Sequence, residues 1–143
     1  MATGHVALFD SAAQDAGSWL NDIMIELEWS DRHLALQALR GTLHAVRDHL
    51  PLELSAHLAA QLPTLIRGIY FENWRPSETP VRDRNRADFL MRVSEAITQD
   101  VDDDEIVAIA GAVLRVLELR ISEGEALKVF EALPKSIREL RGG

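Results

Sequence analysis

Cysteine is missing from this 143-residue sequence, and glycine and proline are scarce, at 8 and 5 residues. Without cysteine the chain has no disulfide, no thiolate nucleophile and no cysteine-ligated metal site. The low glycine and proline content disfavours a fold of many short strands joined by tight turns. Leucine and alanine are abundant instead, and both favour long helices, so we expect an all-α fold.

Long apolar runs and a basic excess are missing as well. No stretch approaches the roughly 18 apolar residues that a bilayer span needs, and the N-terminus lacks the pattern of a secretory signal. The net charge is −8, from 15 Lys and Arg against 23 Asp and Glu, which is unsuited to binding a phosphate backbone. We therefore expect a cytoplasmic protein with no nucleic-acid partner and no membrane partner.

Hydrophobic spacing predicts four helices before residue 72 and four after residue 83. The first helix is expected over residues 11–27, where apolar residues recur at helical spacing. Pro51 and Pro63 are each expected at the first position of a helix, which does not need an amide hydrogen. The proline-containing segment 72–83 is the one convincing linker.

Two nearly identical hexapeptides indicate an internal repeat. LPTLIR occupies residues 62–67 and LPKSIR occupies residues 133–138, an offset of 71, and Asp31 recurs as Asp102 at the same offset. Apolar positions also pair across three helices, and the first helices of the two halves align at an offset of 70. We predict duplicated four-helix repeats, about eight helices in all, packed with pseudo-twofold symmetry. The predicted organisation is a single domain, 1–143, made of repeat one (10–71), the linker (72–83) and repeat two (84–141).

Capping residues support these boundaries. Asp31 is well placed to cap the second helix, and the acidic run that begins at Asp100 suits the positive N-terminal end of the sixth. Ser122 and Glu125 have the spacing of a capping box, which predicts the start of the seventh helix.

The run LHAVRDHLPLELSAHLAAQLPTLIRGIYFENWRPSETP, together with a second half that ends in LP and IREL, carries a family resemblance. It resembles a family of uncharacterised bacterial proteins known as domain of unknown function 2267, from about Gly17 to Arg141. The resemblance implies an all-helical, cytosolic bacterial protein. It brings no activity, cofactor or catalytic residue that can be transferred to this chain.

Metal-binding and catalytic patterns are not found. The five histidines (His5, His33, His44, His49 and His57) lack metal-ligand spacing. A calcium loop starting at Asp100 would need glycine and glutamate where Glu105 and Gly111 stand. No nucleophile elbow or phosphate-binding glycine loop is present either. We expect no metal, no cofactor and no catalytic residues, although enzyme activity stays open.

Aromatic and basic residues gather where the first half meets the linker. Tyr70, Phe71 and Trp74 stand near Arg67 and Arg75. Such a cluster can bind an anionic ligand or an acidic partner peptide. The same aromatic residues can instead seal the two repeats together, and this interpretation is favoured because aromatic side chains bury the largest area.

The recurrence of arginine at one position in both halves leads to a further hypothesis. Arg67 matches Arg138 at the offset that relates Asp31 to Asp102. Buried arginine usually needs an anionic partner, so ion pairs Asp31–Arg67 and Asp102–Arg138 are predicted within the repeats. The alternative is that all four side chains are exposed.

These observations favour a non-catalytic protein-interaction or regulatory module, which acts through a protein partner or through self-association. The alternative is a small-molecule-binding protein or an enzyme, with a pocket between the two repeats near Arg67, Tyr70 and Trp74. An exposed apolar patch would support the first and a concave polar site the second.

Overall fold

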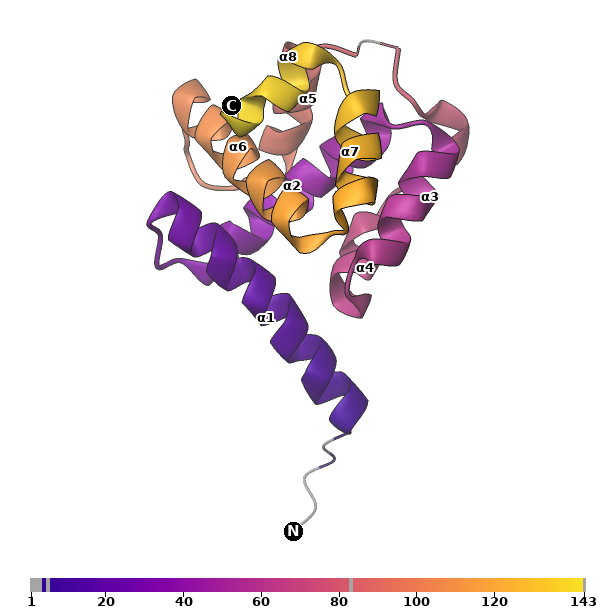
Figure 1. Cartoon of the computed structure of the whole chain (residues 1–143). Coiled ribbons are helices and arrows are strands. Elements are labelled where there is room, and N and C mark those ends of the chain that lie inside the picture. Colours follow the sequence, from indigo (N-terminus) through magenta and orange to yellow (C-terminus); the bar gives the residue numbers. More distant parts are fainter. Residues whose placement is uncertain (1–3, 5, 83, 143) are drawn as a thin grey trace.

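All regular secondary structure among the described residues is helical (Figure 1). The computed structural model describes residue 4, residues 6–82 and residues 84–142, so His5 and Asp83 lie outside the described residues. Within them the structure contains no strand, and the predicted all-α fold is confirmed. The elements are α1 (Ala7–Leu27), α2 (Arg32–His49), α3 (Leu52–Gln61), α4 (Thr64–Tyr70), η1 (Pro76–Glu78), α5 (Arg86–Glu95), α6 (Asp103–Arg120), α7 (Glu123–Ala132), α8 (Lys135–Arg138) and η2 (Glu139–Arg141).

Side-chain caps fix the starts of the two longest central helices. Asp31 accepts hydrogen bonds from the backbone amides at the start of α2, as the sequence predicts. Asp102 begins α6 with a complete capping box, in which its carboxylate accepts from the amide of Glu105 and the Glu105 carboxylate accepts in return. Each cap satisfies amide groups that have no partner inside the helix. The first helix starts at Ala7, four residues earlier than predicted.

Other helix starts differ from the prediction by small amounts. Pro51 and Pro63 occupy the N-cap positions of α3 and α4 rather than the first helical positions. The capping box expected at Ser122 is half formed, because the Ser122 side chain accepts from the amide of Glu125. The Ser122 amide donates instead to the side chain of Gln61, at 2.9 Å. The start of α7 is thereby tied to the end of α3.

Helices from one half of the chain pack on helices from the other half. The long helices α2 and α6 contact each other; α1 packs on both of them, and α5 also packs on both. The shorter helices α3 and α7 contact each other at one side. This arrangement is consistent with two similar units in which the first helix of each crosses to the long helix of the other. The resulting core is shared by both halves.

The predicted ion pairs between the recurring aspartates and arginines do not form. Among the described residues no ion pair joins Asp31 to Arg67 or Asp102 to Arg138. The reason is that both carboxylates are already used as N-caps of their own helices. An N-cap carboxylate points along the helix start and is not available to a distant guanidinium.

The arginines of the twin hexapeptides cap the preceding helix instead. Arg67 donates to the carbonyl oxygens of Ala59 and Leu62, both at 2.9 Å. Arg138 donates to the carbonyl oxygen of Leu133 at 3.0 Å, the equivalent position in the second half. The last carbonyls of a helix have no amide partner within it, and the proline that follows cannot supply one. The repeated hexapeptide is therefore a helix-to-helix junction with its own cap.

A close approach of two backbones joins α2 to α5. A Cβ atom built at Gly41 would collide with the carbonyl oxygen of Val93 on α5. Any residue other than glycine would push the two helices apart, so the smallest residue is required here. This contact places the middle of α2 against α5, and both helices line a cleft.

Candidate functional site

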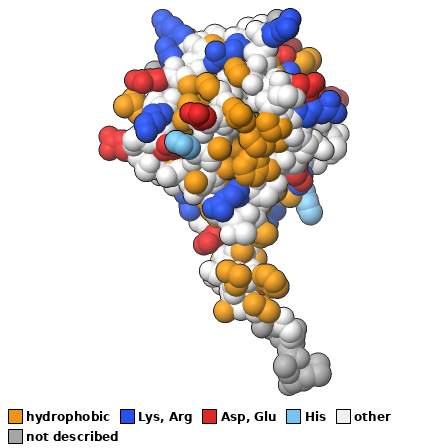
Figure 2. Space-filling model, turned by 90° about the vertical axis from the view of Figure 1, so that its right-hand side faces the viewer, with side chains coloured by type: hydrophobic (Ala, Val, Ile, Leu, Met, Phe, Trp, Pro, Cys, Tyr) orange, Lys and Arg blue, Asp and Glu red, His pale blue; other side chains and the backbone are white. Residues whose placement is uncertain are grey.

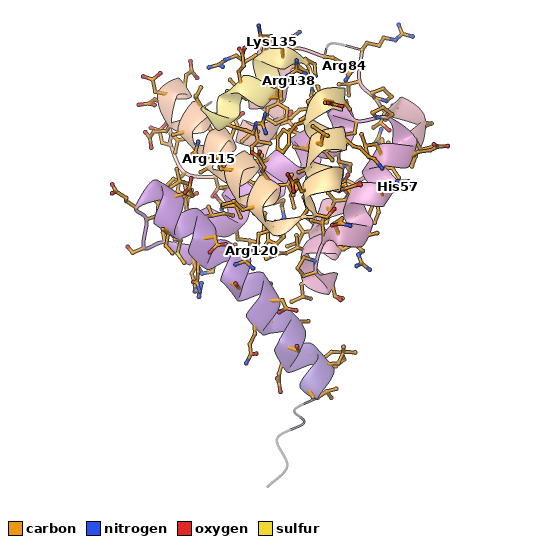
Figure 3. All side chains as sticks on the ribbon, in the orientation of Figure 1. His57, Arg84, Arg115, Arg120, Lys135 and Arg138 are labelled. Carbon is orange, nitrogen blue, oxygen red and sulfur yellow. The ribbon has the colours of Figure 1, made fainter. Side chains whose placement is uncertain are left out.

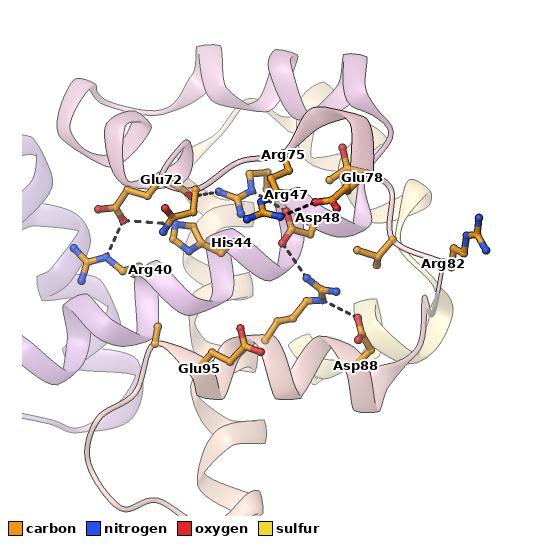
Figure 4. A pocket seen from close by; sticks show the side chains of 15 residues that line it. Arg40, His44, Arg47, Asp48, Glu72, Arg75, Glu78, Arg82, Asp88 and Glu95 are labelled. Atoms are coloured by element: carbon orange, nitrogen blue, oxygen red, sulfur yellow. Dashed lines mark hydrogen bonds and ion pairs between the residues drawn. The ribbon is translucent and has the colours of Figure 1, made fainter.

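A polar cleft of about 760 Å³ lies between α2, α5 and the linker, which runs from the end of α4 to the start of α5. Its lining includes as many acidic as basic side chains, and it is the junction between the two halves (Figure 4). The charged lining residues are Arg40, Arg47, Arg75, Arg82, Arg92, Asp48, Glu72, Glu78, Asp88 and Glu95.

Arg47 is the most deeply buried of these cations, with only 3% of its surface exposed. Its guanidinium pairs with the neighbouring carboxylate of Asp48 at 2.9 Å. It also donates to the carbonyl oxygens of Tyr70 and Glu72, at 2.7 and 2.6 Å. A single buried arginine thus fastens the C-terminal part of α2 to the first residues of the linker. Charge-assisted bonds of this kind are stronger than bonds between neutral groups.

A second arginine connects α5 to α2 across the cleft. Arg92 lies between two carboxylates, 2.9 Å from Asp88 and 3.2 Å from Asp48 (Figure 4). Burial alone would lower the pKa of Arg92, but the hydrogen bond to Asp88 and both carboxylates raise it. At the other end of the cleft Arg40 pairs with Glu72 at 2.9 Å. The ion pairs therefore run through the cleft from α5 to the linker.

His49 is fully buried at the edge of this network. Its Nδ1 lies 2.8 Å from the carbonyl oxygen of Ala45, and its Nε2 lies 3.2 Å from the carboxylate of Asp88. Burial lowers the pKa of His49, against the opposing effects of the Ala45 carbonyl and the Asp88 carboxylate, and the nearby Arg92 adds to the lowering. Burial dominates because the ring has no exposed surface.

His44 occupies a similar place one turn earlier on α2. Its Nε2 lies 2.7 Å from the carbonyl oxygen of Ile69 and 3.6 Å from the carboxylate of Glu72. Burial lowers the pKa of His44, and its hydrogen bond to Ile69 opposes the change. Both histidines therefore hold α2 against another element, and burial favours their neutral forms.

The chemistry of this cleft is that of a closed network of ion pairs. Arg40, Arg47 and Arg92 each bind a carboxylate inside the cleft, which leaves little positive potential for an anionic ligand. In the described part of the chain, no three side chains of the metal-ligating types come close enough together to hold a metal ion. The cleft fits a structural junction, or a site for a polar ligand of no net charge.

The predicted linker cluster is only partly brought together at this cleft. Tyr70 is buried and its hydroxyl donates to the carbonyl oxygen of Ser55. Phe71 packs edge-on against Tyr70 and is tilted against Trp74, with ring centroids 5.3 and 5.0 Å apart. Arg75 lines the cleft, whereas the Arg67 side chain caps α3. These aromatic rings pack on one another, and their role as a seal between the two repeats stays a prediction.

A second feature is the first part of α1, which projects from the body of the molecule (Figure 1). We call residues 7–15 the projecting segment; none of them is buried. Leu8 and Phe9 are 70% and 68% exposed, and hydrophobic side chains follow the segment in Figure 2. The first buried residue of α1 is Trp19. A short helix with bare apolar side chains gains little stability in water without a partner.

A third feature is a hollow of about 860 Å³ where α6 ends and α7 begins. We call it the α6–α7 hollow. Leu119 and Leu127 on its wall are 82% and 61% exposed, whereas Ile121 and Phe130 are buried. Arg141 lies over the ring of Phe130, 4.1 Å from its centroid. Exposed apolar side chains beside a hollow are typical of contact surfaces for other proteins.

Comparison with known proteins places the chain in a family. Residues 17–140 match the model of a family described as an uncharacterized conserved protein, DUF2267. The chain belongs to this family. No curated protein matches the DUF2267 chain. Among its described residues there is no helix of the length and apolar character that crossing a membrane requires.

The matched region of the DUF2267 chain begins at residue 17, so the projecting segment lies outside it. The cleft lies inside it, and so does the hollow except for Arg141. The sequence does not reveal the cleft network, although one signal was available. Arg40, His44, Arg47 and Asp48 recur at the spacing of one helix face, which marks a polar stripe on an otherwise apolar helix.

Proposed function

We propose that this protein is a non-catalytic interaction module that binds a protein partner through the projecting segment of α1. The single observation that carries the proposal is the exposure of Leu8 and Phe9 on a helix that leaves the body of the fold. An amphipathic helix that inserts its apolar face into a groove is a common mode of protein recognition. Exposed phenylalanine and leucine side chains are the apolar groups that a hydrophobic groove receives from such a helix.

The composition of the segment supports this mode of binding. The α1 helix carries acidic residues but no lysine or arginine. Two of its acidic side chains, Asp22 and Glu26, pair with Arg120 and Arg115 of the body. Trp19 and the residues after it carry the buried face of α1, whereas none of residues 7–15 is buried. A cytoplasmic location belongs to the same proposal, since the chain lacks cysteine.

Site-specific photocrosslinking tests this proposal. A photoreactive phenylalanine analogue is placed at Phe9 in one variant and at Met91 in a control, because Met91 is an exposed apolar residue of α5. Illumination of cells that express each variant should give covalent protein adducts with Phe9 labelled and not with Met91 labelled. Equal adducts from both positions, or none from Phe9, would count against the proposed function.

A second candidate function rests on the cleft. Its volume of about 760 Å³ is in the range of small-molecule sites, and a polar ligand without net charge would suit its balanced lining. A thermal-shift screen of polar metabolites tests it. A compound that raises the melting temperature of the protein, and not of an Arg75→Ala variant, would support a ligand site over a simple junction. Arg75 is suited to this test because it lines the cleft and is largely exposed.

A further inference from the structure

The projecting segment and the α6–α7 hollow can be related through the linker. At the offset of 70 that aligns the first helices, the projecting segment corresponds to residues 77–85 of the linker region. That region folds back over the end of α2, where the Val81 amide donates to the carbonyl oxygen of Asp48 at 2.9 Å. Arg84, labelled in Figure 3, donates to the carbonyl oxygens of His49 and Ala132. In the first half the end of the long helix is therefore covered.

The equivalent place in the second half is bare. At the offset of 71, Leu119 and Arg120 of α6 stand where Asp48 and His49 stand on α2. Leu119 is 82% exposed, and the hollow opens beside it. The segment that would cover this place by analogy is the projecting segment, but α1 continues as a straight helix and carries it away from the body (Figure 1). Among the described residues, the end of α6 therefore has an exposed leucine and the start of α1 has an exposed segment.

We propose that the projecting segment of one copy of this chain docks on the α6–α7 hollow of a second copy, and that the second copy docks on the first in the same way. The inference rests on the proposed function and names the partner. Leu8 and Phe9 are the anchors on the segment, and Leu119 and Leu127 are the apolar walls that receive them. The result is a closed twofold dimer, the commonest symmetry of soluble oligomers.

The area available favours a second copy over another partner. The nine residues 7–15 span about 13 Å as a helix, and one such docked helix buries roughly 600 Å² when both surfaces are counted. Stable specific interfaces start at about 1,200 Å², so a single docked segment would make only a weak, transient contact. Two reciprocal dockings reach this size, and they require a partner that carries both the segment and the hollow.

Charge plays a smaller part in this contact. The segment contains Asp10 and Asp15 and no basic residue, and Arg138 on the wall of the hollow pairs with no carboxylate in the described part of the chain. Glu123 and Glu131 also line the hollow and oppose an acidic segment. Because three glutamates and two arginines line the hollow, charge does not attract the acidic segment, and the apolar anchors must carry the contact.

Sedimentation velocity on the full-length protein tests the dimer. The wild type should shift with concentration from its monomer mass of 16.0 kDa to twice that mass. Leu8→Glu/Phe9→Glu and Leu119→Glu/Leu127→Glu should each weaken the dimer by at least about a hundredfold, because each removes two anchors from both dockings. Met91→Glu, at another exposed apolar position, should leave the dimer unchanged. Far-UV circular dichroism verifies that all variants remain folded.

A mixing experiment then tests reciprocity. The two double variants together still supply one intact segment and one intact hollow, so their mixture should dimerise more strongly than either alone. A wild type that is monomeric throughout, or a dimer that survives Leu119→Glu/Leu127→Glu, would overturn the inference. If the wild type is monomeric while Phe9 still gives specific crosslinks to another protein, the proposed function stands and only self-association fails. Loss of both results removes the two proposals together.

Discussion

The two halves of the molecule bury the same kind of helix pair in different ways. In the first pair α5 crosses α2, and in the second pair α1 crosses α6. The predicted offsets place Phe89 over Trp19 and His49 over Arg120, and both aromatic residues are buried. The His49 ring meets Phe89 edge-on with centroids 5.5 Å apart, and the Arg120 guanidinium lies 5.8 Å from the Trp19 ring centroid. The geometry recurs although the polar chemistry differs.

The ion pairs across these two helix pairs differ in which helix carries the arginine and which the aspartate. On the first pair Arg92 of α5 binds Asp48 of α2. On the second pair the arginine is on the long helix: Arg120 of α6, labelled in Figure 3, binds Asp22 of α1 at 2.7 Å. A helix interface thus requires filled space and complementary charge, and either helix can supply the cation.

The pairs differ most in their exposure to solvent. The linker lies over the first pair, so Arg47 and His49 are buried. No comparable segment in the described structure covers the second pair, and the Arg115 and Arg120 side chains stay 39% and 30% exposed. A buried charge is costly to leave without its partner, whereas an exposed pair contributes little. The first pair should therefore be much more sensitive to substitution.

The largest expected effect comes from Arg47 and its counterpart. Arg47→Ala leaves the carbonyls of Tyr70 and Glu72 without a donor and weakens the neutralisation of Asp48, so the free energy of unfolding should fall by about 3–5 kcal/mol. Glu118→Ala, at the equivalent position on α6, removes a half-exposed pair and should cost less than about 1 kcal/mol. Urea unfolding measures both. Similar losses would mean that the linker does not shield the first pair.

A smaller effect is expected where α2 and α5 approach most closely. Gly41→Ala puts a Cβ atom into the carbonyl oxygen of Val93 and should reduce stability by about 1–3 kcal/mol. Gly17→Ala is the matched control in the interior of α1, where the added Cβ meets nothing within 4 Å. There alanine should stabilise the helix by about 0.5–1 kcal/mol. Thermal melts of the two variants should therefore shift in opposite directions.

The helices and the repeated junctions could be predicted from the sequence because they depend on local signals. Hydrophobic spacing and the cap at Asp31 act within a few residues. The recurrence of Arg67 as Arg138 correctly marked one role used twice, but the partner was wrong. Sequence spacing does not show that the nearest acceptors are the carbonyls at the end of the preceding helix. The cleft network was out of reach because it joins α2 to α5, 44 residues apart at Arg92 and Asp48.

Between about pH 5 and pH 7.5, the pH dependence of stability should arise from the histidines of α2, in the first pair. The lowered pKa values of His49 and His44 mean that the unfolded chain binds more protons than the folded chain as the pH falls below about 6.5. Stability should therefore be highest above that pH and should decrease toward about pH 5, by less than about 1.4 kcal/mol per pH unit for each histidine.

A variant isolates the part that His49 contributes. His49→Leu removes one titrating group, so its unfolding free energy should vary less between about pH 5 and pH 7.5 than that of the wild type. Urea titrations at several pH values measure the slope. Arg120→Leu, at the equivalent position, should leave the slope unchanged. A full wild-type slope in His49→Leu would show that the pKa of this histidine is not lowered in the folded protein despite its burial.

The smallest effect is expected at the exposed ion pair between Arg120 and Asp22. Arg120→Ala removes an ion pair with Asp22, a hydrogen bond to Ser18 and the contact with Trp19, and it should cost about 1 kcal/mol. Part of this loss should disappear at high salt, because ions screen an exposed pair. The loss caused by Arg47→Ala should persist, since carbonyl acceptors under the linker are not screened. If both losses respond to salt alike, solvent reaches the two helix pairs equally, and burial by the linker does not explain their difference.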